Sequence, residues 1–91
     1  DYMSKIRRIE EITRREMEGF SDPRIKEIRI MGACVCIEVY DPDTIRGYQQ
    51  FAYEHGVFSR PFLNYMYAMV PYVIREEELV KVLQTMKEWF S

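Results

Sequence analysis

Residues 25–40 limit the fold more than any other segment, because they are rich in Ile and Val and extend without a helical repeat. Ile28 and Ile30 alternate with charged residues, which is the pattern of a strand with one buried face. After Gly32 the chain is apolar on both sides, as in a strand of a sheet that is covered on both faces. Gly32 itself indicates a bulge or a close backbone approach. The segment therefore predicts one long or two short strands.

Helical patterns lie at both ends of the chain. Residues 1–20 carry alternating basic and acidic side chains around an apolar stripe, and Gly19 is a suitable stop for this first helix. The last segment begins with three acidic residues, which suit the positive end of a helix dipole. Behind them lies a broad apolar stripe, formed by Leu79, Val82, Leu83, Met86, Trp89 and Phe90.

A further helix is predicted in the middle of the chain. Its start is Asp41-Pro42-Asp43, in which a capping carboxylate precedes a proline with the φ angle of a first helical residue. We expect it to run to about His55, before Gly56, and Gly47 within it indicates close packing. Residues 57–59 and 65–70 then predict two short strands around a turn at residues 61–64.

The order of these elements predicts an α+β fold. We expect a two-layer small domain in which helices pack on a mainly antiparallel, three- to four-stranded sheet. The 91 residues suffice for a single domain, residues 1–91, but not for a complete enzyme of the large cofactor-binding kinds.

Charge and apolar content exclude several classes of partner. The 13 Lys and Arg residues and 15 Asp and Glu residues give a net charge of −2, so nucleic acid is not an expected partner. No apolar run approaches the roughly 20 residues that span a bilayer, and the charged first segment does not resemble a secretory signal. Cys34 and Cys36 lie one residue apart and imply no disulfide framework, so we expect a cytoplasmic protein without a membrane partner.

Arg60 is the most informative candidate for a functional residue. It is the only Asp, Glu, Lys or Arg between Glu54 and Arg75, and its neighbours are mostly aromatic or apolar. A guanidinium stays charged at neutral pH, so it needs a partner. That partner is a distant carboxylate such as Glu38, an aromatic ring, the solvent or an anionic ligand. The planar fork of arginine suits a carboxylate ligand in particular.

Other polar residues carry weaker signals. His55 is explained by the end of a helix, and Tyr65, Tyr67 and Tyr72 by core or interface packing. Cys34 and Cys36 are expected to be buried strand residues, and with one histidine the chain predicts no metal site. No catalytic pair of residues and no phosphate-binding glycine loop is present.

Three stretches resemble the C-terminal small domain of class III pyridoxal-phosphate aminotransferases. They are residues 30–38, residues 56–62 with Arg-Pro-Phe, and residues 67–74 with the pattern Tyr-x-Met-x-Pro-Tyr. The last two resemble most closely the members of this class that act in biotin biosynthesis, the diaminopelargonate synthases. The resemblance covers about residues 29–90. Leu63 departs from it, because the family often has glycine there, and Val70 replaces the first residue of a Pro-Pro pair.

The resemblance implies a function for a longer protein. In it, this chain is the C-terminal lobe of a homodimeric, fold-type I enzyme that transfers an amino group from S-adenosylmethionine to the keto acid 8-amino-7-oxononanoate. Arg60 matches the arginine that binds the carboxylate of the keto acid, and Tyr67 matches a tyrosine on the adjoining strand with a supporting role.

The cofactor lysine of the family lies in a large domain that is absent here. We therefore expect the chain alone to be inactive, to bind no pyridoxal phosphate and to self-associate. Two alternatives remain open: a lobe of another class III ω-aminotransferase, or a non-catalytic α+β module for ligand binding or oligomerisation.

Overall fold

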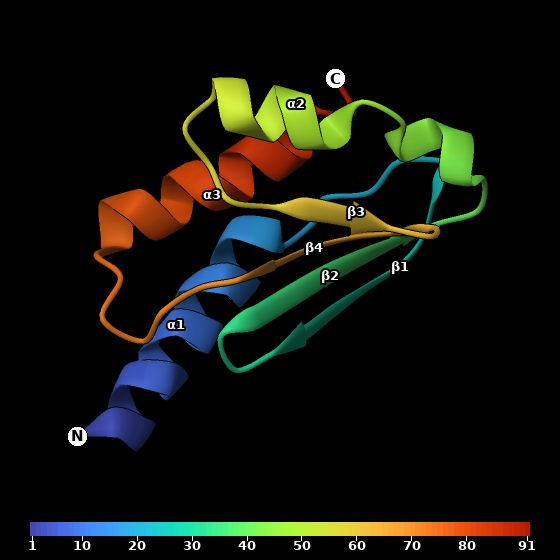
Figure 1. Cartoon of the computed structure of the whole chain (residues 1–91). Helices are drawn as coiled ribbons and strands as arrows, with labels where there is room; N and C mark the ends of the chain where they lie inside the picture. The colour runs from blue at the N-terminus through green and yellow to red at the C-terminus, as the bar shows by residue number, and fades with distance from the viewer.

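The computed structural model describes residues 1–91, and its four strands form one antiparallel sheet in the order β1-β2-β4-β3 (Figure 1). The three α-helices gather on one side of this sheet, with α1 and α3 packed against each other. The elements are α1 (Tyr2–Met17), β1 (Ile25–Met31), β2 (Cys34–Val39), the 3-10 helix η1 (Pro42–Ile45), α2 (Tyr48–Glu54), β3 (Arg60–Phe62), β4 (Tyr65–Met69) and α3 (Glu76–Glu88). The predicted α+β fold is confirmed.

The Ile- and Val-rich segment forms two strands, joined by a turn at Gly32. Gly32 has a positive φ of 55°, and a Cβ atom there would lie 3.1 Å from Cγ2 of Ile6. The predicted close approach at this glycine is thus confirmed. The Gly32 amide also donates a hydrogen bond of 2.8 Å to Oε1 of Glu10, which ties the turn to α1.

The central helix differs from the prediction. Asp41 caps its start as expected, accepting a hydrogen bond of 3.0 Å from the Asp43 amide. The helix is not continuous, however, because Arg46 is extended and Gly47 adopts a left-handed φ of 87° between η1 and α2. Gly47 therefore marks a break between η1 and α2. Its left-handed backbone conformation is one that only a residue without Cβ adopts readily. A Cβ atom added at Gly47 would lie 3.8 Å from Cη2 of Trp89, which is an ordinary van der Waals distance, so the positive φ and not close packing explains this glycine.

The first of the two short strands lies three residues later than predicted. Residues 57–59 are not a strand, because the Val57 amide donates to the carbonyl of Ala52 and so completes the end of α2. The strand is Arg60–Phe62, and the turn after it consists of Leu63 and Asn64. The second strand, Tyr65–Met69, agrees with the prediction.

Alternation along the strands separates a covered face from an open face. On β2 and β4 the side chains toward the helices are buried and join the core, whereas those on the other side are half-buried or exposed, except for the buried Glu38. Cys34 and Cys36 lie on this open face and are half-buried, so the prediction that they are buried was wrong. No helix of the chain combines the length and the apolar character needed to cross a membrane.

Glu38 is a buried carboxylate at the corner where β1, β2 and the β3–β4 turn meet. Its oxygens lie 2.6 Å from Nη2 of Arg29, 3.6 Å from Nζ of Lys26 and 3.4 Å from Nδ2 of Asn64. The hydrogen bond from Arg29 is the main reason why the pKa of Glu38 lies below its usual value. Arg29 in turn contacts the Tyr65 ring, 5.9 Å from its centroid.

The lowered pKa of Glu38 predicts a loss of stability in acid. The ionised carboxylate stabilises the folded state above the unfolded pKa, and this contribution disappears as pH falls through the folded pKa. Urea unfolding between about pH 7 and about pH 3 should therefore show a difference between wild type and Glu38→Gln that shrinks with falling pH. Glu11→Gln is the control, because Glu11 is exposed and forms no ion pair. A Glu38→Gln penalty that persists unchanged in acid would contradict the role of the ionised carboxylate.

Leu63 is the only non-glycine residue with a positive φ, at 56°. A left-handed conformation costs an L-residue with Cβ about 1–2 kcal/mol, and the Leu63 side chain is 71% exposed, so it recovers little by packing. Leu63→Gly should therefore raise the free energy of unfolding by about 0.5–1 kcal/mol, after the extra chain entropy of glycine is included. Asn64→Gly, at a position without positive φ, should lower it.

Candidate functional site

The strand pairing places four side chains in a row across the open face. Arg29 is opposite Cys36, Cys36 is opposite Tyr67, and Tyr67 is opposite Arg60. Neighbouring strands are about 4.8 Å apart, so Arg60 and Tyr67 adjoin each other at the β3 edge of the row. The two residues that the sequence singled out as a site are thus brought together by the β3–β4 pairing.

Arg60 is exposed and has no partner within the chain. It takes part in none of the ion pairs, side-chain hydrogen bonds or cation–π contacts of the structure. Pairing with Glu38 and stacking on a ring, two of the alternatives that the sequence left open, are both excluded. The solvent and an anionic ligand remain. All the donor groups of the guanidinium are free to bind an anion.

Sheet topology explains why Arg60 does not reach Glu38. Strand β3 pairs only with β4, whereas Glu38 lies on β2, on the other side of β4. Glu38 is also occupied by Arg29 and Lys26, as described above. Glu38, the carboxylate that the sequence offered as one possible partner of Arg60, therefore pairs with cations on the opposite half of the sheet.

Exposed apolar side chains lie on the same face as Arg60, on β3 and β4. Phe62 follows Arg60 by two residues on the same side of β3 and is 62% exposed, and Met69 is an exposed neighbour of Tyr67 on β4. Neither was predicted as a site residue: Phe62 fell in the predicted turn at residues 61–64, and Met69 lay in the predicted strand 65–70 without a polar group to mark it. Alternation counted from Arg60 would have found Phe62. A lone guanidinium beside apolar surface suits an aliphatic acid, which offers a carboxylate and an alkyl chain.

The weaker candidates have structural contacts. His55 lies against Phe51, with ring centroids 4.2 Å apart, and its Nδ1 atom is 2.7 Å from the Phe51 carbonyl oxygen. Tyr72 packs edge-on against Tyr2 near the start of α1. Burial raises the pKa of the Cys36 thiol, which makes it a poor nucleophile. No three His, Cys, Asp or Glu side chains are placed to hold a metal ion.

The lysines of this chain do not form a site for pyridoxal phosphate. Such a site needs a lysine within reach of a phosphate-binding cradle. Lys26 is paired with Glu38, Lys87 donates to the Glu16 carbonyl oxygen, and Lys5 lies over the Tyr72 ring. Lys81 is exposed on α3 beside Gly56. These residues do not fit the cofactor.

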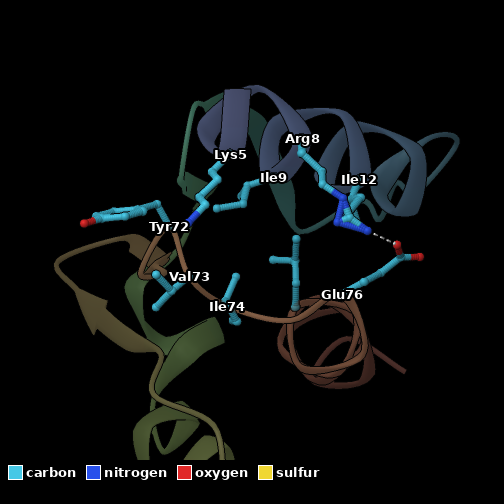
Figure 2. Close-up of a pocket in the computed structure, with 9 residues that line it drawn as sticks. Lys5, Arg8, Ile9, Ile12, Tyr72, Val73, Ile74 and Glu76 are labelled. Carbon is cyan, nitrogen blue, oxygen red and sulfur yellow. Dashed lines mark hydrogen bonds and ion pairs between the residues drawn. The ribbon is translucent and has the colours of Figure 1, made fainter. Parts of the chain in front are cut away.

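One cavity, of about 330 Å³, lies between α1 and the segment that leads into α3 (Figure 2). Its floor is apolar, with Ile9 and Ile74 among the residues that line it. Across its rim Arg8 donates a hydrogen bond of 2.9 Å to Oε1 of Glu76, so these charges neutralise each other. The cavity lies on the helix side of the sheet, away from Arg60. It is a gap in the packing between α1 and the start of α3.

Comparison of the sequence with known proteins relates the chain to one group of aminotransferases. No protein-family model matches the chain. It is 35% identical over 71 residues to the adenosylmethionine-8-amino-7-oxononanoate aminotransferase of Saccharomyces cerevisiae, a match that covers 74% of the chain and 15% of that protein. The chain thus spans only a small part of the relatives that it matches.

Solved structures show the same architecture. The adenosylmethionine-8-amino-7-oxononanoate aminotransferase of Methanocaldococcus jannaschii superposes with a TM-score of 0.82 at 18% identity, covering 98% of this chain and 23% of that one. The ornithine aminotransferase of Toxoplasma gondii superposes with a TM-score of 0.67 at 29% identity, covering 96% and 21%. The resemblance noted in the sequence is confirmed: the chain belongs to the class III aminotransferases and matches in sequence their adenosylmethionine-8-amino-7-oxononanoate members.

Proposed function

We propose that this chain is the C-terminal lobe of a pyridoxal-phosphate-dependent aminotransferase of biotin biosynthesis. The full-length enzyme transfers an amino group from S-adenosylmethionine to 8-amino-7-oxononanoate. Similarity to several adenosylmethionine-8-amino-7-oxononanoate aminotransferases supports the proposal. In this proposal the cofactor and its lysine belong to the part of the enzyme outside residues 1–91, and the lobe alone is inactive.

The unpaired guanidinium of Arg60 on the open face is the observation that carries the proposal. The acceptor is a monocarboxylic acid with a long alkyl chain, as its name states. Arg60 offers an unpaired guanidinium on the open face, and Phe62 and Met69 offer apolar surface nearby. We assign Arg60 to the carboxylate of the acceptor and Tyr67 to a supporting contact beside it. Phe62 and Met69 then border the alkyl chain.

The assembly of the enzyme is also part of the proposal. The open face carries half-buried cysteines and tyrosines and exposed apolar side chains, which a soluble protein normally covers. In the full-length enzyme we expect this face to be covered by the rest of a homodimeric, cytoplasmic protein. No nucleic acid or membrane takes part.

Arg60→Ala in the full-length enzyme tests the carboxylate assignment. A charge-assisted hydrogen-bond pair is lost, so the KM for 8-amino-7-oxononanoate should rise about 10- to 100-fold, while the KM for S-adenosylmethionine changes little. Steady-state kinetics with each substrate varied in turn gives both constants. Arg60→Lys should recover only part of the affinity, because an ammonium lacks the planar fork.

Arg7→Ala is the matched control, because Arg7 is an exposed arginine on α1 without an ion pair. It should leave both KM values at the wild-type level. An acceptor KM that is the same for Arg60→Ala and Arg7→Ala would refute the assignment of Arg60.

A second candidate is another class III ω-aminotransferase. The similarity to an ornithine aminotransferase, at 29% identity over nearly the whole chain, favours it. The two candidates differ in the substrates that the full-length enzyme accepts. Turnover of 8-amino-7-oxononanoate with S-adenosylmethionine supports the first, whereas turnover of ornithine or an ω-amino acid without activity on the keto acid supports the second.

The chain by itself is expected to self-associate. Its open face exposes large apolar side chains on three strands, among them Met31, Phe62 and Met69. Sedimentation velocity over a concentration series should show species larger than the 11.0 kDa monomer. The double variant Met31→Lys with Met69→Lys should shift the distribution toward the monomer. A monomeric wild type at all concentrations would contradict this expectation.

A further inference from the structure

Ser59 lies directly before Arg60 and is almost completely buried, with 3% of its surface exposed. Its Oγ atom donates a hydrogen bond of 2.8 Å to the carbonyl oxygen of Tyr67. Tyr67 is the residue opposite Arg60 in the β3–β4 pairing. The hydroxyl therefore links the two chain positions that carry the proposed acceptor site.

Strand β3 needs such a link because its own pairing is weak. It has only three residues, it is an edge strand, and it pairs only with β4. The ring nitrogen of its central residue, Pro61, faces the solvent side of the strand, because Pro61 and Met66 are a non-hydrogen-bonded pair. With only three residues, β3 forms few backbone hydrogen bonds that set where Arg60 lies relative to Tyr67.

Side-chain hydrogen bonds reinforce β3 at both ends. After the strand, Nδ2 of Asn64 donates to the Val39 carbonyl oxygen at 2.9 Å, and the Asn64 carbonyl accepts from the Val39 amide at 2.8 Å. These contacts hold the turn on β2. Before the strand, the hydrogen bond from Ser59 to Tyr67 is the corresponding contact. It is the one nearer to Arg60, since only a single peptide unit separates them.

We propose that Ser59 is a positioning residue for Arg60. By donating to the Tyr67 carbonyl it holds the start of β3 on β4. The distance between the Arg60 guanidinium and the Tyr67 ring on the open face then stays constant. Ser59 touches neither substrate nor cofactor in this role. The inference rests on the proposed function of Arg60 and adds to it the group that keeps the arginine in place.

The test compares Ser59→Ala with wild type in the full-length enzyme. Loss of a neutral hydrogen bond should loosen Arg60 and raise the KM for 8-amino-7-oxononanoate about 3- to 10-fold. The KM for S-adenosylmethionine and kcat at saturating acceptor should stay near wild type. Ser59→Thr, which keeps the hydroxyl and suits an extended chain, should restore the acceptor KM.

Thr85→Ala is a closely matched control. Thr85 is also 3% exposed, and its hydroxyl donates to a backbone carbonyl, that of Lys81, at the same distance of 2.8 Å, but within α3. Thr85→Ala removes a buried methyl group as well as the hydroxyl, so it should lower the unfolding midpoint at least as much as Ser59→Ala. Only Ser59→Ala should raise the acceptor KM; an equal rise in both variants would mean a general loss of stability and would overturn the proposal.

A double variant separates this inference from the proposed function. If Ser59 acts through Arg60, Ser59→Ala should have no further effect on the acceptor KM in the Arg60→Ala background. An unchanged KM in Arg60→Ala refutes the proposed function itself. A raised KM in Arg60→Ala with a wild-type KM in Ser59→Ala refutes only the positioning role.

Hydrogen exchange provides a readout that does not depend on activity. In Ser59→Ala the amides of residues 60–67 should exchange faster than in wild type, whereas those of β1 should not change. In Thr85→Ala any faster exchange should be confined to α3. Wild-type exchange of residues 60–67 in Ser59→Ala would also overturn the proposal.

Discussion

The pairing of β2 with β4 is the contact on which the rest of this structure depends. It joins two hairpins, β1–β2 and β3–β4, that would each be only marginally stable alone. Once joined, they present one continuous apolar face, on which Ile37 and Met66 are fully buried under the helices. The same pairing aligns the opposite side chains into an open face. Core and candidate site are thus two sides of a single sheet.

The distribution of charge over the open face follows from the strand order. Two cations, Arg29 and Lys26, converge on Glu38 at the β1–β2 half of the sheet. The β3–β4 half contains Arg60 and no acidic residue. Because β4 stands between β2 and β3, the two halves cannot neutralise each other. An unpaired guanidinium at an edge strand is the consequence, and it is the physical basis of the proposed carboxylate site.

The apolar pattern of β2 is not accounted for by the helices of this chain. The segment 33–37 has the apolar pattern of a strand covered on both faces, yet the helices of the chain cover only one. Cys34 and Cys36 are accordingly half-buried. The chain matches only 15% of the length of its Saccharomyces cerevisiae relative. The pattern of this strand is therefore consistent with a second covering layer supplied by the remainder of a larger protein.

Local sequence signals determined the element types, the α+β class and the choice of Arg60, because periodicity, capping residues and an isolated charge act over a few neighbours. The break at Gly47 and the start of β3 at Arg60 were not predictable in this way. Both depend on contacts beyond neighbouring residues, since the Trp89 indole donates a hydrogen bond to the Thr44 carbonyl in η1 and β3 begins where Arg60 pairs with Tyr67. Only the tertiary structure decided that Arg60 is unpaired and lies opposite Tyr67. It alone also decided that Ser59 donates a hydrogen bond to the Tyr67 carbonyl. The pairing partner and the register of a strand are set by contacts between residues far apart in the chain, which no local pattern specifies.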